Sequence, residues 1–188
     1  MVNQSKPTVA IFGGSFDPPH MGHQLIVENA TRLLDIDKLL VVPAYLSPFK
    51  TSTLADAHTR LTWCHTLFDS ISMVKVVDFE VKEGKSTVTA DSVKHLCQAY
   101  HIKYLIIGSD NLSTLTKWHA FEWLNETITW VIATRENYNL DTDELKSWKL
   151  LTVDALISST QIRTEKDLQF IDDKIKASVK QLLHKGSQ

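Results

Sequence analysis

The sequence predicts an α/β fold, a doubly wound parallel sheet of five to six strands with helices on both faces. Short apolar runs, several rich in β-branched residues, alternate with segments of helical periodicity along the chain. No repeat, low-complexity segment or linker interrupts this alternation, and the length of 188 residues suits one domain over residues 1–188. Ligands bind such sheets at the carboxyl ends of the strands, so the loops after strands one, four and six are where a site is expected.

The first half of the chain supplies three of the predicted strands. The run TVAIF at residues 8–12 is short and apolar and ends in Gly-Gly, which predicts a buried strand followed by a tight loop. The elements predicted after it are, in order, a helix over 22–34, a strand over 37–44, a loop over 45–57, a helix over 58–70 and a strand over 73–79.

The second half continues the alternation. The run TITWVIAT at residues 127–134 is rich in β-branched residues and predicts a strand. The other elements predicted here are a helix over 90–100, a strand over 102–108, a short sixth strand over 149–153 and a closing amphipathic helix over 165–183.

Charge and cysteine content exclude several classes of protein. The formal net charge is −2, so the chain has no general basic surface for nucleic acid or for an anionic membrane. Its two cysteines, Cys64 and Cys97, do not suggest a disulfide framework, and a reducing compartment fits. Neither a secretory leader pattern nor an apolar run long enough to span a bilayer is present, so the cytoplasm is the expected location. Nothing in the sequence fixes an oligomeric state.

The stretch IFGGSFDPPHMGH, residues 11–23, combines a glycine turn with two histidines. Gly13 and Gly14 end the first strand, where glycine lets the backbone turn sharply and lets a ligand approach its N–H groups. A loop of this kind at the end of a buried strand is expected to bind a ligand through its backbone.

The two histidines follow at the start of the next helix. Pro18 and Pro19 stand just before it, and proline suits the first turn of a helix. His20 and His23 are three positions apart and therefore share one face of that turn, with Gly22 between them. A helix N-terminus attracts anions through its free N–H groups and its dipole, and two imidazoles add further donors. The arrangement predicts a phosphate cradle.

Zinc ligation and dinucleotide binding are the competing interpretations of this stretch. The sequence has no HExxH pattern and no Cys-x-x-Cys pair to complete a zinc site. It also lacks the GxGxxG pattern of dinucleotide-binding folds. Either histidine alone would more often be structural, but the pair after a glycine turn favours phosphate binding.

A second motif, ISSTQIR at residues 157–163, follows the last short strand. Ser158, Ser159 and Thr160 stand just before a predicted helix turn, where hydroxyls either cap the helix or bond phosphate oxygens. Arg163 adds a planar donor that is always charged. On this motif alone, capping is the commoner role.

Taken together, the two motifs resemble (H/T)xGH and ISSTxxR of the nucleotidylyltransferase superfamily, in the right order and at opposite ends of the chain. Residues 106–124, IIGSDNLSTLTKWHAFEWL, are similar to the GxD…KW segment of bacterial nicotinate-nucleotide adenylyltransferases. Residues 83–93, EGKSTVTADSV, resemble the SYT-containing segment of that family. The resemblance covers nearly the whole chain and implies a Rossmann-like sheet.

The resemblance implies transfer of the adenylyl group of ATP to nicotinate mononucleotide, giving nicotinate adenine dinucleotide and pyrophosphate. The attacking group is already a phosphate anion, so the chemistry needs in-line positioning and charge neutralisation. Mg²⁺ is expected to be held mainly by ATP phosphates and water, and no residue is assigned as a metal ligand. Two alternatives stay open: another nucleotidylyltransferase, such as one acting on phosphopantetheine, and a nucleotide-binding module without catalysis.

The site residues implied by the resemblance fall into two groups. The catalytic residues are His20, His23 and Arg163. The ATP site combines the first loop, the histidines and the second motif: Gly13, Gly14, Ser15, Phe16, His20, His23, Ser158, Ser159, Thr160 and Arg163. The acceptor-binding residues are Lys50, Thr87, Thr89, Asp110, Trp118 and Arg135.

Two acceptor residues have structural alternatives. Trp118 is expected to stack on a pyridine ring, although core packing is the commoner fate of a lone tryptophan. Asp110 is expected to contact ribose or metal, or else to cap a helix.

The sequence also departs from the family pattern at three places. The Pro-Pro-His-Lys or Pro-Pro-His-Arg of the family is SPFK here at residues 47–50, so Phe49 replaces a histidine that binds mononucleotide phosphate. The Arg-Pro-Gly after the fifth strand is REN at residues 135–137. The segment 83–93 carries one extra residue, which leaves open whether Thr87 or Thr89 contacts the substrate.

Overall fold

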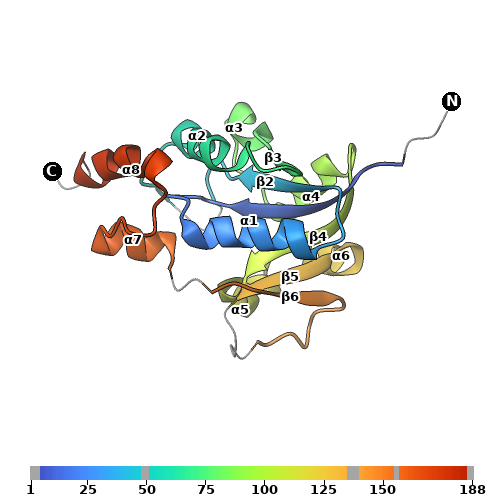
Figure 1. Ribbon diagram of the computed structural model, residues 1–188. Helices are drawn as coiled ribbons and strands as arrows, with labels where there is room; N and C mark the ends of the chain where they lie inside the picture. Colours follow the sequence, from blue (N-terminus) through green and yellow to red (C-terminus); the bar gives the residue numbers. More distant parts are fainter. Residues whose placement is uncertain (1–4, 48–50, 135–139, 155–156, 186–188) are drawn as a thin grey trace.

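Six parallel strands form one sheet at the centre of the computed structural model, which describes residues 5–47, 51–134, 140–154 and 157–185 (Figure 1). The strands lie in the order β3-β2-β1-β4-β5-β6, and every neighbouring pair is parallel. They are β1 (Thr8–Gly14), β2 (Lys38–Pro43), β3 (Val74–Val76), β4 (His101–Gly108), β5 (Thr129–Thr134) and β6 (Trp148–Thr152). The predicted doubly wound sheet is confirmed, with the sixth strand present.

Helices connect the strands and cover the sheet. They are α1 (Met21–Leu33), α2 (Ala57–Phe68), α3 (Phe79–Glu83), α4 (Thr89–Leu96), α5 (Leu112–Leu115), α6 (Phe121–Thr127), α7 (Ser159–Glu165) and α8 (Asp173–Lys185), with a 3₁₀ turn, η1 (Ser109–Asn111). Among the described residues, none of these helices combines the length and the apolar character that crossing a membrane requires.

Alternate residues of each central strand enter two separate hydrophobic cores. In β1, Ala10 and Phe12 pack in the first core, whereas Val9 and Ile11 pack in the second. This follows from the period of two along a strand, and burial on both sides explains why the strand reads as an unbroken apolar run.

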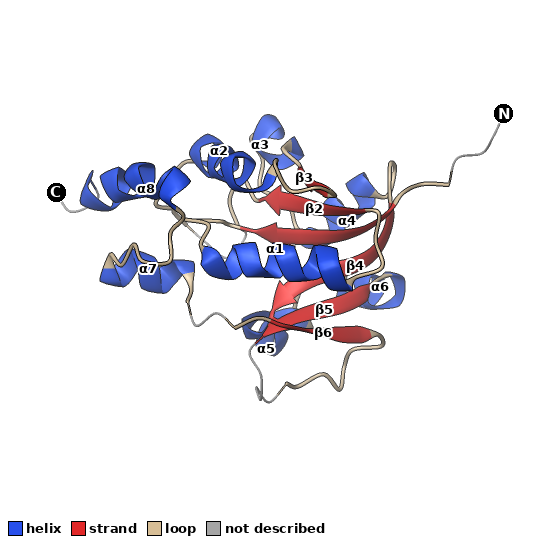
Figure 2. Cartoon of the chain, in the orientation of Figure 1, coloured by secondary structure: helices blue, strands red, loops and turns tan. Residues whose placement is uncertain are grey.

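Helices lie on both faces, as predicted (Figure 2). The first core takes its helical residues from α1, α2, α7 and α8, for example Val27, Leu67 and Val179. The second takes them from α4, α5 and α6, for example Val93 and Leu124.

The predicted strand over 73–79 is too long. β3 is an edge strand that pairs with β2 at only three positions, from Val74 to Val76. Phe79 instead begins α3, and its ring stacks on that of His95 in α4, with centroids 4.6 Å apart. Because α3, α5 and α6 have only five, four and seven residues, they are too short for a periodic pattern to reveal.

The predicted closing helix over 165–183 starts too early: α8 covers it only from Asp173 onward, and Glu165 is the last residue of the preceding helix, α7. α7 ends at Glu165, because Lys166 adopts a left-handed conformation with φ of 56°. A new helix begins at Asp173, after Asp172 has accepted a hydrogen bond from the N–H of Lys174 across 2.9 Å. The break matters for the site, because α7 carries the second motif.

Candidate active site

The carboxyl ends of β1 and β4 meet at the centre of the sheet, where the order of the strands reverses. β1 pairs with β2 on one side and with β4 on the other, where Phe12 lies opposite Ile106. Gly14 and Gly108 are the last residues of these neighbouring strands. In an open α/β sheet, this is the place where a crevice for a ligand forms. The loop after β1 and the turn that carries Asp110 both start here.

The sharp turn after β1 is made by Phe16 and not by a glycine. Phe16 has φ of 47°, in the left-handed region that larger residues seldom adopt. Its buried ring packs against Phe12, Phe68 and His23, with centroids 5.4, 6.4 and 4.9 Å away. Gly14 leaves room for this ring, since a Cβ there would lie 3.2 Å from it. The expectation that the two glycines make the turn is therefore wrong, and the packing of an aromatic ring holds it instead.

The two histidines lie side by side at the start of α1. His20 is the N-cap residue, and the rings of His20 and His23 have centroids only 3.8 Å apart, which confirms that they share one face. The backbone N–H of His20 donates to Nδ1 of His23 across 3.2 Å. Since Nδ1 accepts, the neutral ring of His23 carries its proton on Nε2. Pro18 and Pro19 stand before the N-cap and not within the first helical turn.

Burial keeps His20 uncharged. The residue is 6% exposed, and its desolvation lowers its pKa to about 4. Among the described residues, its Nδ1 atom is buried without a hydrogen-bond partner. A buried polar atom in this state is unfavourable until something bonds it. A ligand atom that reached Nδ1 would therefore be favoured.

The second motif docks onto the first. Ser159 Oγ donates to the carbonyl oxygen of Pro18 across 2.9 Å, and Arg163 Nη1 donates to that of Asp17 across 2.5 Å. The other Arg163 nitrogen, Nη2, donates to Thr160 Oγ1 across 3.0 Å. The helix begins inside the motif rather than after it, and Ser158 caps it by accepting from the N–H of Gln161. Capping is thus the observed role of Ser158 alone.

Thr87 and Thr89 lie at the start of α4. The Oγ1 atom of Thr87 is 3.1 Å from Ser92 Oγ. Thr89 is the first residue of the helix, whose N-cap, Val88, provides no side-chain cap. Two further predicted acceptor residues, Lys50 and Arg135, lie outside the described residues, as does Phe49.

Asp110 follows β4 within the 3₁₀ turn η1. Gly108 is the N-cap of this turn, so the alternative role of Asp110 as a cap is not observed. The carboxylate of Asp110 is exposed and folds back, with Oδ1 accepting from the Asn111 amide across 3.1 Å. A Cβ at Gly108 would lie 2.4 Å from that oxygen, so glycine at this position lets the carboxylate sit at the end of β4.

Trp118 packs edge-on against Trp130, with ring centroids 6.3 Å apart. It is half-buried at the border of the second core, between the exposed Lys117 and His119. Its indole N–H is buried and has no partner among the described residues. The structure thus shows core packing for this residue, and stacking on a bound ring stays a prediction.

Three buried charged residues under the site escaped the sequence analysis: Asp17, Arg60 and Glu80, which are 1%, 1% and 4% exposed. Arg60 shares a helix face with Trp63, Cys64 and Leu67, so its position on the apolar side of α2 was a usable signal. No comparable pattern marks Glu80, which lies in a five-residue helix.

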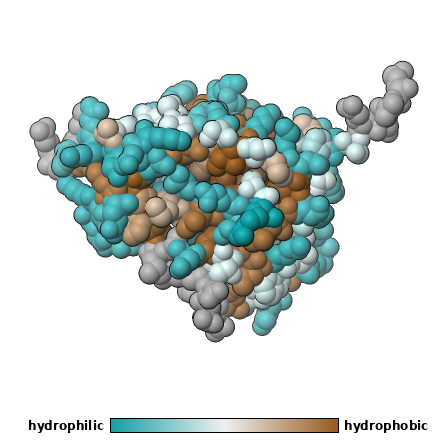
Figure 3. All heavy atoms as spheres, in the orientation of Figure 1, coloured by the Kyte–Doolittle hydropathy of each residue, from teal (hydrophilic) through white to brown (hydrophobic). Residues whose placement is uncertain are grey.

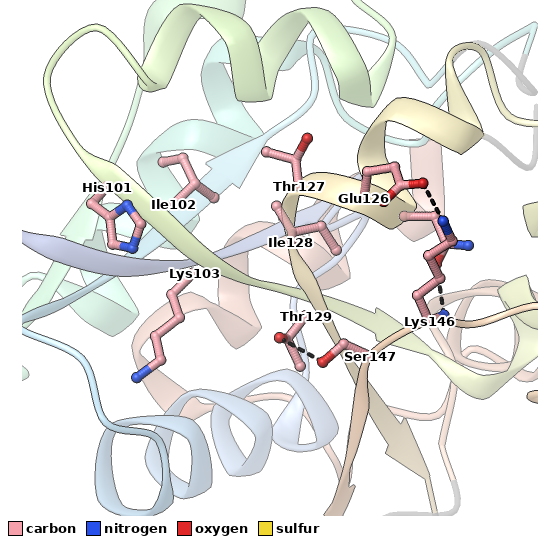
Figure 4. A pocket seen from close by; sticks show the side chains of 10 residues that line it. His101, Ile102, Lys103, Glu126, Thr127, Ile128, Thr129, Lys146 and Ser147 are labelled. Carbon is pink, nitrogen blue, oxygen red and sulfur yellow. Dashed lines mark hydrogen bonds and ion pairs between the residues drawn. The ribbon is translucent and has the colours of Figure 1, made fainter.

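A hollow of about 280 Å³ lies at the opposite end of the strands from the switch point, near the amino ends of β4 and β5 (Figure 4). His101, Thr129 and Lys146 are among the residues that line it, and Lys146 forms an ion pair with Glu126. None of the predicted site residues lines it. On the face that carries α1, several apolar patches alternate with hydrophilic side chains (Figure 3).

Known proteins share this sequence and this fold. A cytidylyltransferase-like family model matches residues 11–165. A "probable nicotinate-nucleotide adenylyltransferase" of Sulfurovum sp. is 61% identical over 183 residues, 97% of each chain. A protein of the same name from Nitratiruptor sp. is 46% identical over 157 residues, 82% of this chain and 86% of the relative.

Solved structures agree with the fold. A nicotinic acid mononucleotide adenylyltransferase of Plasmodium falciparum, in complex with NaAD, superposes with a TM-score of 0.74 at 22% identity, covering 95% of both chains. A putative nicotinate-nucleotide adenylyltransferase of Vibrio parahaemolyticus gives 0.62 at 21% identity, covering 94% of this chain and 98% of that one. With the family model and the close relatives, the docked pair of motifs leads to one conclusion: the chain belongs to the nicotinate-nucleotide adenylyltransferases of the cytidylyltransferase-like family.

Proposed function

We propose that the chain transfers the adenylyl group of ATP to the phosphate of nicotinate mononucleotide. An oxygen of the acceptor phosphate forms a bond to the α-phosphorus, and the bond from that phosphorus to the bridging β-phosphate oxygen breaks. The products are nicotinate adenine dinucleotide and pyrophosphate. The observation that carries the proposal is the docking of Ser159 and Arg163 onto the loop that leads into His20.

In this proposal, the first loop and the two histidines hold the reacting phosphates. The backbone of Gly13, Gly14, Ser15 and Phe16 faces the α-phosphate and ribose. His23 donates from Nε2, because its Nδ1 accepts from the His20 backbone. Donors fixed before the reaction stabilise the charge that develops without having to reorganise. His20 stays neutral at pH 7 and offers its buried ring nitrogen.

The start of α7 holds the leaving pyrophosphate. Ser159 and Thr160 bring hydroxyls, and Arg163 brings a guanidinium whose side chain is 25% exposed. The ion pair of Arg163 with the buried Asp17, 3.7 Å apart, keeps the cation in place. A planar cation suits two phosphate oxygens at once, so Arg163 neutralises charge as pyrophosphate departs.

A Mg²⁺ ion is proposed to arrive with ATP, with phosphate oxygens and water as most of its ligands. Among the described residues, no group of three His, Cys, Asp or Glu side chains is placed to bind a metal. When bound, the ion neutralises phosphate charge.

The acceptor lies on the other side of the switch point. Trp118 stacks on the pyridine ring, and backbone N–H groups near Thr87 and Thr89 bond the ring carboxylate. Asp110 contacts a ribose, and Lys50 and Arg135 contact the acceptor. A carboxylate only accepts hydrogen bonds, whereas an amide also carries two donor hydrogens. A pocket lined with N–H groups therefore favours nicotinate over nicotinamide.

One experiment tests the proposal directly. The protein is incubated with ATP and Mg²⁺ and, in parallel, with nicotinate mononucleotide, nicotinamide mononucleotide or phosphopantetheine, and the adenylylated products are identified by mass. Pyrophosphate and a dinucleotide are expected with nicotinate mononucleotide. Turnover of phosphopantetheine alone would assign the chain to a different reaction, and absence of turnover with every acceptor would favour a binding module.

A further inference from the structure

A buried carboxylate and a buried guanidinium hold the chain where it leaves β2. Tyr45 follows β2, and its backbone N–H donates to Glu80 Oε2 across 3.3 Å. Its carbonyl oxygen accepts from Arg60 Nη2 across 2.5 Å. Both polar groups of one peptide residue are therefore fixed by side chains that are 4% and 1% exposed. Buried charges of opposite sign that are also hydrogen-bonded make a rigid support.

Arg60 belongs to both halves of the site. Its Nη1 atom donates to Ala44 O and to Ser15 O, each across 2.7 Å, and its Nε donates to Ala55 O across 3.1 Å. It thus joins the loop after β1 to both ends of the β2–α2 connection, residues 44–56. A substitution of Arg60 would disturb both the ATP side of the site, at the loop after β1, and the acceptor side, at the β2–α2 connection. Its effects on the two substrates could therefore not be told apart.

Among the described residues, the side-chain hydrogen bonds of Glu80 lie on the acceptor side. Besides Tyr45, its carboxylate accepts from Ser92 Oγ across 2.9 Å, and Ser92 Oγ lies 3.1 Å from Thr87 Oγ1. A serine has one hydroxyl proton, and Ser92 gives it to Glu80, so Thr87 must donate to Ser92. A single chain of hydrogen bonds therefore runs from Tyr45 through Glu80 and Ser92 to Thr87.

A second tie joins the same two segments at the surface. Ser86 Oγ donates to the carbonyl oxygen of Leu46 across 2.5 Å. Ser86 is exposed, whereas Glu80 and Ser92 are buried. The segment after β2 and the segment before α4 are thus joined by a buried chain of hydrogen bonds and by one hydrogen bond at the surface.

We infer that Glu80 is a positioning residue for the acceptor: its carboxylate sets the spacing between the start of the β2–α2 connection and the segment of Thr87. The inference rests on the proposed function, in which the segment of Thr87 and, from the β2–α2 connection, Lys50 contact nicotinate mononucleotide. A small displacement of the groups that position a substrate is enough to lower the efficiency with which that substrate reacts. Loss of the carboxylate therefore weakens the acceptor and spares ATP.

The test compares Glu80→Gln with Glu83→Gln, which removes an exposed charge from the end of the same helix. We expect Glu80→Gln to raise KM for nicotinate mononucleotide about tenfold, as for the loss of one charged hydrogen bond. KM for ATP and kcat should stay within about twofold, and Glu83→Gln should match the wild type. A purely structural role would instead lower kcat through a smaller folded fraction, with both KM values unchanged, and would overturn the inference.

Two further measurements keep the test decisive. Ser86→Ala removes the outer tie from an exposed position, so it folds even if Glu80→Gln does not, and a rise of about threefold in the acceptor KM is expected. Hydrogen exchange at residues 44–47 and 86–88 should speed up in both variants, and unchanged exchange would overturn the inference. A wild type that makes no dinucleotide would reject the proposed function instead, and the exchange data would still decide whether Glu80 holds the two segments.

Discussion

Arg163 Nη1 lies 2.5 Å from the carbonyl oxygen of Asp17, although the two residues are 146 positions apart in the chain. This hydrogen bond joins the helix of the second motif to the loop of the first. It places a permanent cation on the loop that leads into His20, and the first of four predictions concerns this cation.

Arg163→Lys should lower kcat strongly. Lysine keeps the charge but loses the planar fork that bonds the Asp17 carbonyl oxygen and that is proposed to bond two phosphate oxygens as well. We expect a fall in kcat of about tenfold to a hundredfold, smaller than the roughly 10²–10³ for a donor lost entirely, because lysine keeps the charge. Steady-state kinetics measure it, with Arg32→Lys on the exposed side of α1 as the matched control. A kcat equal to that of the wild type would remove Arg163 from catalysis.

His23→Ala should lower kcat much more than it weakens ATP binding. The imidazole acts on charge that grows in the transition state, and loss of such a donor costs about 10²–10³ in rate. His23 also accepts the His20 N–H, so a second variant separates the two effects. His23→Asn can keep an acceptor for that N–H, and should restore the thermal midpoint without restoring kcat. Recovery of activity in His23→Asn would make the residue structural.

His20 should make the protein less stable as the pH falls. Its pKa is about 4 when folded and 6.5 as the ordinary value, so between these limits the unfolded chain binds more protons. The stabilising contribution of His20 is fully present above pH 6.5. The free energy of unfolding therefore declines as the pH drops from about 6.5 to about 4. At about 1.4 kcal/mol per pH unit, the loss amounts to about 3 kcal/mol.

Urea unfolding at pH 7.5 and pH 4.5 measures this loss in the wild type and in His20→Asn. Asparagine is a good N-cap residue, so the helix start is preserved. The variant should lose less stability than the wild type on acidification, while the exposed control His119→Asn should behave like the wild type. Equal losses in all three proteins would contradict the assignment.

The acceptor half should distinguish nicotinate from nicotinamide. A mismatch of donors in a buried pocket can cost about 10⁴-fold in kcat/KM, so a strong preference for nicotinate mononucleotide is expected. Trp118→Ala should weaken both acceptors alike and spare ATP, since it removes stacking and not the discriminating N–H groups. Trp148→Ala, at an exposed position on β6, is the control. Equal kcat/KM values for the two acceptors in the wild type would reject a donor-lined pocket.

The strands were predictable because a parallel sheet buries both of its faces. Val9 to Phe12 enter two cores in alternation, so the whole segment is apolar and visible in the sequence. Boundaries set by tertiary contacts were not visible. The end of β3 depends on its edge position, and the end of α7 depends on the backbone of Lys166.

The candidate site was predictable where a motif carries it and not where folding assembles it. His20, His23 and Arg163 stand in recognisable patterns, and Arg163 bonds the loop that leads into His20. Arg60 and Glu80 contact their partners across 45 and 35 positions through backbone atoms. Because these hydrogen bonds go to backbone groups, the partner residue can carry any side chain, and no pattern in the sequence predicts them.

The meeting of the chain's two motifs also sets an order of events during protein synthesis. The histidine loop leaves the ribosome early, whereas the arginine that docks on it is added 146 residues later. At synthesis rates of about 5–20 residues per second, this interval is about 7 to 30 seconds. Through that time the first strands can pair and the histidines can form their helix cap, but the phosphate site is incomplete. A nascent chain therefore completes the docking of the two motifs only near the end of its translation.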